Sequence, residues 1–193
     1  MLKLLNVKVE VIGFDDLPKT VAMLAPNHCS YFDPALILVA LEDKRPGEDY
    51  VNKSPIFLAK DDVAKDKRVK GYAKLIDTFY IDRKNARKAL KTFDEFARFA
   101  KEGHRYPVVF PSGTRSKSGK VGEFKPGAFR MAKKEFMPIV PVTINNALSI
   151  TNAKRKGKLK VQVIFHKAIK PMSFITNDTQ AIAKRVKTIV ESK

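Results

Sequence analysis

Cysteine, long apolar runs and negative charge are all scarce in this 193-residue sequence. With Cys29 as its single cysteine, the chain can form neither an internal disulfide nor a multi-cysteine metal site, which suits a reducing compartment. The longest apolar run, residues 35–41, is far shorter than the roughly 20 residues that span a bilayer. Residues 1–7 are too short for a signal peptide. We therefore expect a protein that carries no visible export signal and does not cross a membrane alone.

The shortage of acidic residues leaves a strong positive charge. Thirty-eight Lys and Arg against 20 Asp and Glu give a net charge of +18 and a pI near 10.0. A field of this size attracts nucleic acid, anionic lipid headgroups or phosphorylated metabolites, and each lysine near an anionic bilayer contributes roughly 1 kcal/mol. Charge alone does not distinguish these partners. The basic runs at 65–70, 83–91 and 154–160 are also typical of solvated faces, so they need not bind any partner.

The apolar periodicity predicts strands that alternate with helices. We expect strands at 8–12, 21–25, 56–59, 79–81, 108–110, 139–144 and 159–165, and helices at 33–41, 84–102, 126–136 and 178–191. The helix at 84–102 is the clearest, since Ala86, Leu90, Phe93 and Phe96 keep the helical period and Gly103 ends it. No repeat, low-complexity tract or long linker interrupts this pattern, which predicts one α/β domain over residues 1–193 with helices flanking a mixed sheet.

Residues 27–33, NHCSYFD, place a histidine and a carboxylate on a loop between a strand and a helix. His28 follows the strand at 21–25, and Asp33 stands where the next helix begins, ahead of Pro34. A histidine that takes a proton from a hydroxyl needs a partner that fixes its tautomer, and four intervening residues let the loop bring Asp33 to the imidazole. An ordinary helix cap at Asp33 is the alternative interpretation.

Other candidate nucleophiles and metal ligands carry weaker signals. Cys29 adjoins His28, but adjacent side chains seldom point at one another, so we interpret it as loop filler rather than a nucleophile. His104 and His166 have no partner at ligand spacing and are interpreted as structural or surface residues. We expect no metal site.

Residues 110–120, FPSGTRSKSGK, form a loop after a buried strand that is typical of a phosphate cradle. Glycine lets backbone N–H groups approach an anion closely, and Arg115 can bind two oxygens at once. The loop is not a P-loop, because Thr114 stands where a glycine is needed and Val121 where Ser or Thr is needed. A flexible basic loop is the alternative.

Two more cations follow short strands and are candidate phosphate ligands. Arg83 ends the segment FYIDR at 79–83, where it can converge with Arg115 or, with Asp82, cap and charge the next helix. Lys60 follows the strand at 56–59 and has the same two interpretations.

Together and in this order, four of these segments resemble the motif blocks of the glycerolipid acyltransferase family, above all its lysophosphatidate (1-acylglycerol-3-phosphate) acyltransferases. The blocks are residues 27–33, 79–83, 110–116 and 140–142, and their order and spacing match over about residues 20–145. One block would be a weak signal, whereas four in order are highly specific.

The resemblance implies a glycerol-phosphate acyltransferase-like fold and a role for each matched residue. His28 resembles the general base that deprotonates the acceptor hydroxyl, and Asp33 the carboxylate that orients it. A second set resembles the site for the acceptor phosphate: Gly113, Thr114 and Arg115, with help from Arg83. A third set resembles a strand that shapes the acyl pocket: Val140, Pro141 and Val142.

The substrates implied are lysophosphatidate and a fatty-acyl thioester on coenzyme A or acyl carrier protein, with phosphatidate as product and no cofactor. The resemblance also implies a peripheral position on the cytoplasmic side of an anionic membrane. Two features depart from the family pattern. Ser112 stands where glutamate is common, and few residues precede the first strand, where relatives carry a helical or hydrophobic docking segment.

Other interpretations keep the charge or the fold but change the function. A non-enzymatic RNA-binding domain would interleave aromatic and basic residues on exposed strands, whereas most of the 13 phenylalanines occupy apolar positions of the expected helices and strands. We therefore expect no nucleic-acid partner. The same fold acylating another glycerophosphate or lysophospholipid, and an inactive membrane-binding homologue, are further alternatives.

Overall fold

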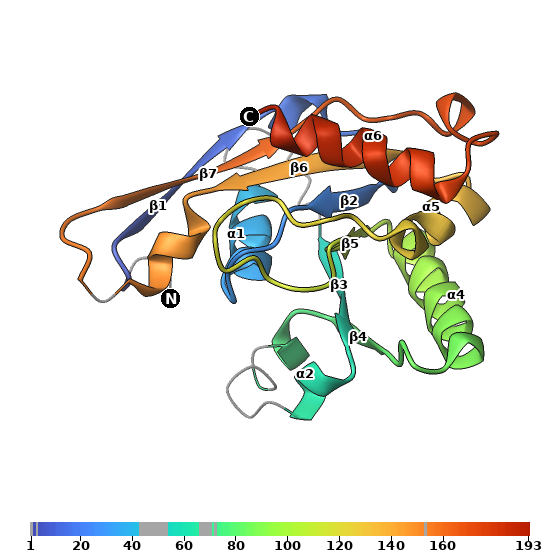
Figure 1. Ribbon diagram of the computed structural model, residues 1–193, viewed down its shortest axis with the longest axis horizontal. Coiled ribbons are helices and arrows are strands. Elements are labelled where there is room, and N and C mark those ends of the chain that lie inside the picture. The colour runs from blue at the N-terminus through green and yellow to red at the C-terminus, as the bar shows by residue number, and fades with distance from the viewer. Residues whose placement is uncertain (1, 3, 43–53, 66–70, 72, 153) are drawn as a thin grey trace.

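A seven-stranded sheet forms the centre of the computed structural model, which describes residues 2, 4–42, 54–65, 71, 73–152 and 154–193 (Figure 1). The strands are β1 (Val7–Ile12), β2 (Met23–Pro26), β3 (Pro55–Lys60), β4 (Thr78–Ile81), β5 (Tyr106–Val109), β6 (Ile139–Asn145) and β7 (Leu159–Phe165). The helices are α1 (Asp33–Ala40), α2 (Asp62–Lys65), α4 (Ala86–Glu102), α5 (Arg130–Lys134) and α6 (Thr179–Glu191), joined by the 3-10 turns η1 (Phe14–Asp16), η2 (Pro126–Phe129), η3 (Ala147–Thr151) and η4 (Pro171–Ser173).

The order of the strands decides where the loops meet. Across the sheet they run β1-β7-β6-β2-β5-β3-β4, and every neighbouring pair is parallel except β6 with β7. The strands β2, β5, β3 and β4 therefore lie side by side with their carboxyl ends at one edge. In parallel sheets this edge is where ligands bind.

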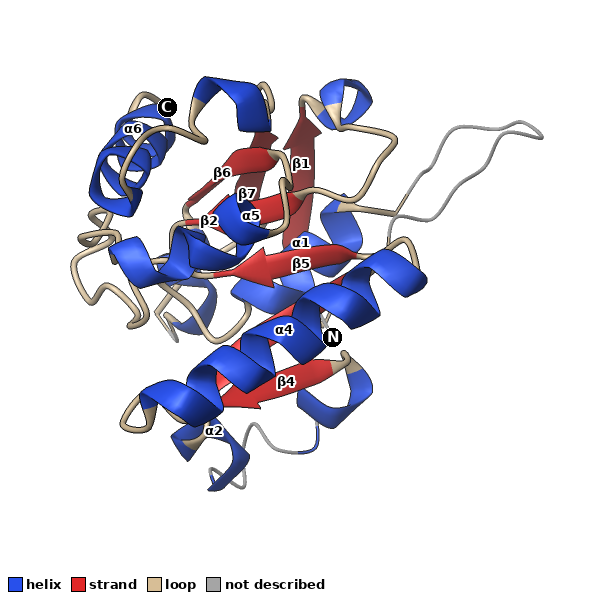
Figure 2. Ribbon diagram, turned by 90° about the vertical axis from the view of Figure 1, so that its right-hand side faces the viewer, coloured by secondary structure: helices blue, strands red, loops and turns tan. Residues whose placement is uncertain are grey.

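The sheet separates two apolar cores. Alternate residues of β2 point to opposite faces, so that Leu24 belongs to one core while Met23 and Ala25 belong to the other. Helix α1 covers the first face with Leu36 and Ile37, and α4, α5 and α6 cover the second (Figure 2). None of the described helices combines the length and the apolar character needed to cross a bilayer.

The observed fold confirms the predicted α/β class, with corrections at particular elements. The helix expected at 126–136 is a 3-10 turn followed by the short α5, and Leu90 is 52% exposed rather than part of the buried face of α4. Asn85, whose side chain accepts a hydrogen bond from the Lys88 N–H, caps α4 in place of Asp82. Most of the basic run at 65–70 lies outside the described residues, while that at 154–160 is largely exposed as expected.

Candidate active site

The His28 imidazole and the Asp33 carboxylate are in direct contact just beyond the end of β2. Nδ1 of His28 lies 2.7 Å from Oδ2 of Asp33. The same oxygen accepts hydrogen bonds from the backbone N–H groups of Cys29 (2.8 Å) and Ser30 (2.9 Å). The carboxylate therefore ties the loop back onto itself, and the interpretation of Asp33 as a cap for α1 is wrong.

This geometry fixes the chemical state in which His28 can act. Asp33 is fully buried, and a carboxylate facing Nδ1 favours the tautomer with its proton on that nitrogen. Nε2 is then free to accept a proton, and no described residue bonds to it. The ring of Phe110 stacks on the imidazole at a centroid distance of 4.2 Å, which adds a second constraint on its orientation.

Asn27 anchors this loop to the neighbouring strand β6. Its side-chain Nδ2 donates to the Ile144 carbonyl (3.0 Å), and its Oδ1 accepts from the Ile144 N–H (2.7 Å). A further bond joins the Ser116 N–H to the His28 carbonyl (2.8 Å). The amide of Asn27 thus extends the strand pairing by one residue and holds the backbone that carries His28.

Cys29 is unsuited to nucleophilic chemistry. Its side chain is buried, and burial together with the charge of Asp33 raises the pKa of the thiol to about 12. The thiolate form is negligible at neutral pH, so the interpretation of Cys29 as loop filler agrees with the structure.

The loop after β5 carries the expected anion-binding residues, but its backbone is partly occupied. Gly113 has a positive φ of 69°, and its N–H donates to the Phe110 carbonyl (3.0 Å). Its own carbonyl accepts from Nη1 of Arg83 (3.2 Å). Gly113 therefore shapes the loop without offering a free N–H to phosphate, a correction to the expected cradle, whereas the N–H groups of Thr114 and Arg115 have no partner among the described residues.

Ser112 braces this loop through a local hydrogen bond. The residue is buried, and its Oγ donates to the Thr114 carbonyl at 3.0 Å. A local hydrogen bond within the turn thus contributes to ordering the loop without a charge.

Arg115 and Arg83 reach the same cavity from different strands. The Arg115 guanidinium lies over the Tyr31 ring, 3.3 Å from its centroid, while Arg83 is held by Gly113. Lys60 also lines the cavity, but its ammonium group pairs with Asp62 at 3.2 Å. The two arginines are therefore better placed than Lys60 to bind an anionic ligand.

These residues surround one large cavity at the carboxyl edge of the sheet. The cavity measures about 850 Å³, and its polar lining includes His28, Thr114, Arg115 and Arg83. Its apolar lining includes Pro34, Phe57, Leu58, Ala59 and Ile76. The volume suits a lipid-sized ligand with an anionic head and an apolar tail.

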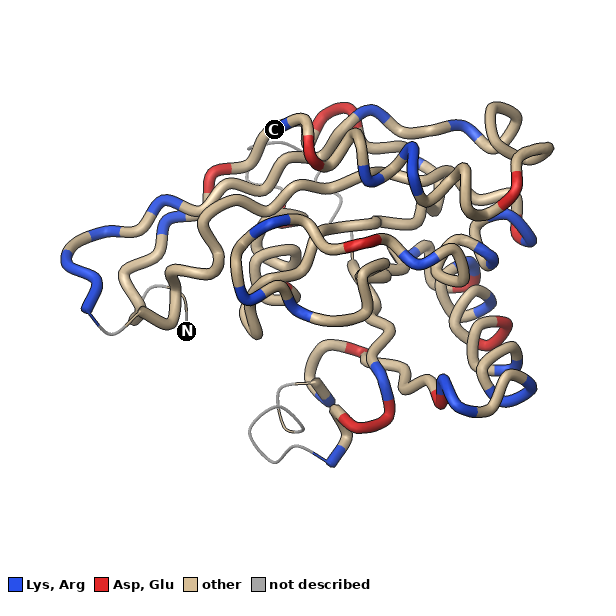
Figure 3. The backbone as a smooth tube through the Cα atoms, in the orientation of Figure 1, with Lys and Arg blue, Asp and Glu red and all other residues tan. Residues whose placement is uncertain are grey.

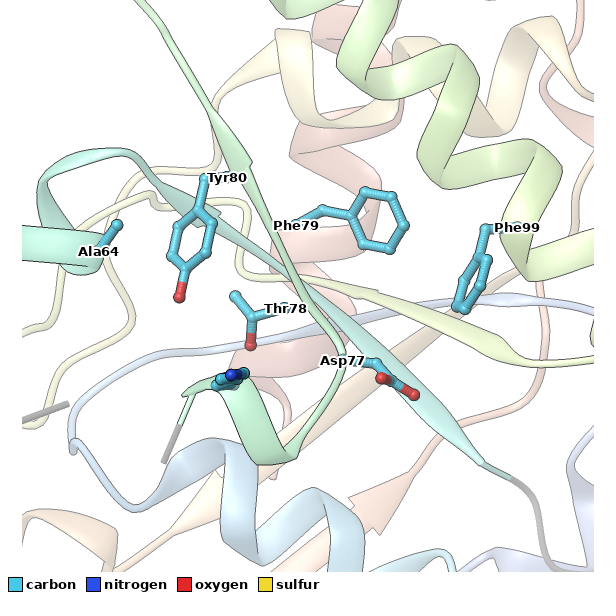
Figure 4. A pocket seen from close by; sticks show the side chains of 7 residues that line it. Ala64, Asp77, Thr78, Phe79, Tyr80 and Phe99 are labelled. Carbon is cyan, nitrogen blue, oxygen red and sulfur yellow. The ribbon is translucent and has the colours of Figure 1, made fainter. Parts of the chain in front are cut away.

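A second, smaller cavity of about 350 Å³ lies beside the edge strand β4 (Figure 4). Phe79 of β4 and Phe99 of α4 lie on one side of the strand, and Tyr80 and Thr78 lie on the other. Thr78 also lines the larger cavity, so the two spaces are neighbours along β4.

Val140, Pro141 and Val142 do not line either of these cavities. They lie within β6, paired with Leu24, Ala25 and Pro26 of β2, and all three are buried. The apolar lining of the larger cavity instead includes residues of β3, Pro34 at the start of α1, and Ile76 ahead of β4. Direct contact of residues 140–142 with an acyl chain is therefore not what the structure indicates.

The remaining histidines lie outside the site. Oγ1 of Thr143 bonds to Nε2 of His166 at 2.8 Å, and burial, with a smaller effect of Lys193, lowers the pKa of this histidine. His104 is exposed at the end of α4. Among the described residues, no group of three or more His, Cys, Asp and Glu side chains could hold a metal ion.

Comparison with known proteins shows the family to which the chain belongs. The family model described as Acyltransferase matches residues 8–145. The chain is 34% identical over 190 residues to a protein named probable 1-acyl-sn-glycerol-3-phosphate acyltransferase from Mycoplasma pneumoniae, covering 94% of this chain and 69% of the relative. A protein of the same name from Mycoplasma genitalium is 32% identical, with 96% and 70% covered.

A solved structure extends the likeness to the fold. The crystal structure of the 1-acyl-sn-glycerophosphate (LPA) acyltransferase PlsC from Thermotoga maritima superposes with a TM-score of 0.73 and 25% identity, covering 99% of this chain and 72% of that one. The family model alone matches more than half of the sequence, and the fold agrees with it. This chain belongs to the acyltransferase family.

Proposed function

We propose that the chain transfers a fatty-acyl group from acyl-coenzyme A or acyl carrier protein to the free hydroxyl of 1-acylglycerol 3-phosphate, which yields phosphatidate for phospholipid synthesis. The observation that carries this proposal is the 2.7 Å contact between His28 and Asp33 at a cavity that two arginines also line. The relatives named for this reaction support the choice of acceptor. The proposal requires no cofactor beyond the acyl donor.

In the proposed reaction, Arg115 and Arg83 bind the phosphate of the acceptor and direct its hydroxyl toward His28. Nε2 of His28 removes the hydroxyl proton as the oxygen attacks the thioester carbonyl, and Asp33 stabilises the imidazolium that forms. The tetrahedral intermediate then collapses, and the thiolate leaves and takes up the proton held by His28, which regenerates the neutral base. Both substrates are held in one cavity, so positioning supplies part of the rate increase.

The structure limits which groups can stabilise the oxyanion. The N–H groups of Cys29 and Ser30 already donate to the Asp33 carboxylate, and the N–H of Ser116 donates to the backbone carbonyl of His28. The unpaired N–H groups of Thr114 and Arg115 remain available at the cavity. We assign them to the developing negative charge or to the acceptor phosphate.

The apolar wall gives the acyl chain a place different from the one implied by the family motif. Phe57, Leu58 and Ile76 line the same cavity as the arginines, and Thr78, which lines both cavities, leads to the second one at Phe79 and Phe99. An acyl chain can follow these side chains while its thioester stays beside His28. We therefore place the chain along β3 and β4, as far as the edge of the sheet.

The test is acyl transfer from a labelled long-chain thioester to lysophosphatidate on anionic vesicles, with coenzyme A and acyl carrier protein donors in separate reactions. His28→Ala should lower the rate by roughly 10²–10⁴-fold, the usual contribution of such a base. His104→Asn is the matched control, since His104 is exposed and asparagine tolerates its positive φ of 49°.

Three outcomes of this assay test the proposed reaction and the role of His28. Phosphatidate made by the parent and the control, but lost in a folded His28→Ala variant, supports both the reaction and the base. Retention of activity in that variant would remove His28 from the mechanism. No product from any protein, with other lysolipid acceptors also tried, would refute the proposed reaction.

A further inference from the structure

The mouth of the reaction cavity is continuous with a basic surface that contains exposed apolar side chains. The turn η3 forms the shared wall, because Leu148 and Thr151 line the reaction cavity while Ile150 and Thr151 line a neighbouring depression of about 460 Å³. Leu4 lines that depression from the other side. The residues around η3 thus connect the site of His28 with the amino-terminal segment of the described chain.

Two segments supply the positive charge of this surface. Residues 113–122 and 146–160 contain eight Lys and Arg and no Asp or Glu. Lys117, Lys120, Lys154, Lys156 and Lys158 are all exposed, and none of them pairs with an acidic side chain among the described residues. Figure 3 shows the charges of residues 154–160 at the left end of the molecule and those of residues 113–122 nearer its centre.

The two segments are brought together by η3. A Cβ built on Gly119 would lie 3.7 Å from Cδ2 of Leu148, so the tip of the 113–122 loop lies against this turn. Arg155 donates to the Leu5 carbonyl and joins the 154–160 segment to the amino-terminal residues. The 113–122 loop therefore meets the second segment at η3, beside the cavity, and the second segment continues from there through residues 154–160.

Exposed apolar residues lie among these charges. Leu4 is 91% exposed, and Leu148 and Tyr31 at the cavity mouth are 39% and 43% exposed. Aliphatic side chains surrounded by lysines match the interface of an anionic bilayer, where the ammonium groups meet lipid phosphates and the leucines enter the acyl boundary. Nucleic acid would instead require open aromatic faces for base stacking, and Arg115 covers the ring of Tyr31.

We propose that this surface, made by Leu4, Leu148, Lys120 and the lysines at 154, 156 and 158, docks the protein on an anionic lipid bilayer with the reaction cavity facing the lipid. The inference rests on the proposed function, since an enzyme acting on a lysolipid gains if the acceptor enters from the membrane without crossing water. It assigns the docking role to the surface that extends from η3, at the cavity, to the 154–160 segment. The basic face of α4 and the outer face of α6 take no part.

The experiment compares two variants that lose the same charge. In the docking variant, Lys154, Lys156 and Lys158 are all changed to Gln. In the control variant, Lys88, Lys170 and Lys184 are changed to Gln, because these lysines are also exposed and have no acidic partner among the described residues. Binding is measured by co-sedimentation with vesicles of phosphatidylcholine and phosphatidylglycerol in equal parts, and with pure phosphatidylcholine vesicles.

Each lysine near an anionic surface strengthens binding by roughly fivefold, so the docking variant should bind about a hundredfold more weakly and the control less than about threefold. Leu4→Ser should weaken binding as well, whereas Met172→Ser, at an exposed position on η4, should not. An equal loss in both triple variants would show that only net charge matters and would overturn the proposal. Undiminished binding of the docking variant would also overturn it.

Two further measurements separate this proposal from others. If the parent prefers single-stranded RNA to vesicles, and the docking variant loses the RNA, the surface binds nucleic acid and the membrane proposal is wrong. Acyl transfer between short-chain, water-soluble substrates should be equal in the parent and the docking variant. If the parent makes no product there or on vesicles, the proposed function fails, while the vesicle measurements still decide the docking surface.

Discussion

The contact between His28 and Asp33 makes Asp33→Asn the most informative single substitution. The change keeps the size of the side chain, and the remaining carbonyl oxygen can still accept from the N–H groups of Cys29 and Ser30. It removes the negative charge beside Nδ1. The variant therefore separates the charge of Asp33 from its role in holding the loop.

The size of the effect follows from Coulomb's law. Opposite charges about 4 Å apart interact by about 4 kcal/mol at an effective dielectric constant of about 20. Each 1.36 kcal/mol corresponds to roughly tenfold in rate, and the partial exposure of His28 screens part of the interaction. We expect kcat/KM to fall by about 10²–10³-fold.

Stability should change much less than the rate. The buried Oδ1 of Asp33 has no partner among the described residues, so the amide nitrogen that replaces it would be an unsatisfied donor. Such a group costs roughly 1–3 kcal/mol. The free energy of unfolding, measured by chemical denaturation, should fall within that range and leave the variant folded at room temperature.

Asp178→Asn provides the matched control. Asp178 accepts from the Ala181 N–H at 2.7 Å and caps α6 far along the chain from the cavity, where asparagine caps equally well. Its activity should equal that of the parent. A folded Asp33→Asn variant with activity within about threefold of the parent would refute the orienting and charge-stabilising role of Asp33.

Three other predictions follow from particular residues. Gly113→Ala places a Cβ 2.5 Å from Nη1 of Arg83 at a positive φ, which should lower kcat/KM for the phosphorylated acceptor roughly tenfold. Gly127→Ala is the control, because its Cβ would meet no neighbour, and it should leave kcat/KM unchanged. Cys29 should resist alkylation by iodoacetamide at pH 8 in the folded protein, because its pKa is raised to about 12; rapid modification with loss of activity would contradict this. Burial also raises the pKa of Tyr106 from 10.0 to about 12, so its contribution to stability is complete below pH 10.0 and is lost as the pH rises toward 12. Tyr106→Phe should therefore show a smaller decrease in unfolding free energy than the parent over that interval. Identical pH profiles of the two proteins would refute the raised pKa of Tyr106.

Local patterns predicted the elements of this fold well and their arrangement poorly. The period of α4 and the alternation of β7 are properties of the nearby sequence, so both could be predicted within a few residues. The antiparallel pairing of β7 with β6, and the position of β1 next to β7, depend on which faces are buried in the folded chain. Leu90 kept the helical period yet is exposed, because periodicity alone does not show where the covered face ends.

The candidate site could be predicted in its chemistry but not in its supports. His28, Asp33 and Arg115 were identified because their residue types and spacing point to proton transfer and anion binding. The clamp between Asn27 and Ile144 joins residues 117 positions apart, and no local pattern marks it. The stacking of Phe110 on His28 likewise requires β2 and β5 to be neighbours, which only the sheet order establishes.

The motif at 140–142 shows how one short apolar segment is compatible with two roles. A central strand that is buried on both faces and a strand that lines an acyl pocket both appear as continuous apolar runs. In the structure, the Val142 carbonyl accepts from the Asn27 N–H at 3.3 Å, and Ile144 on the same strand binds the Asn27 side chain. The strand is therefore placed to control the position of His28 rather than to contact the acyl chain. A substitution in β6 should accordingly affect all acyl donors alike, whereas one in β3 or β4 should alter the preference for chain length.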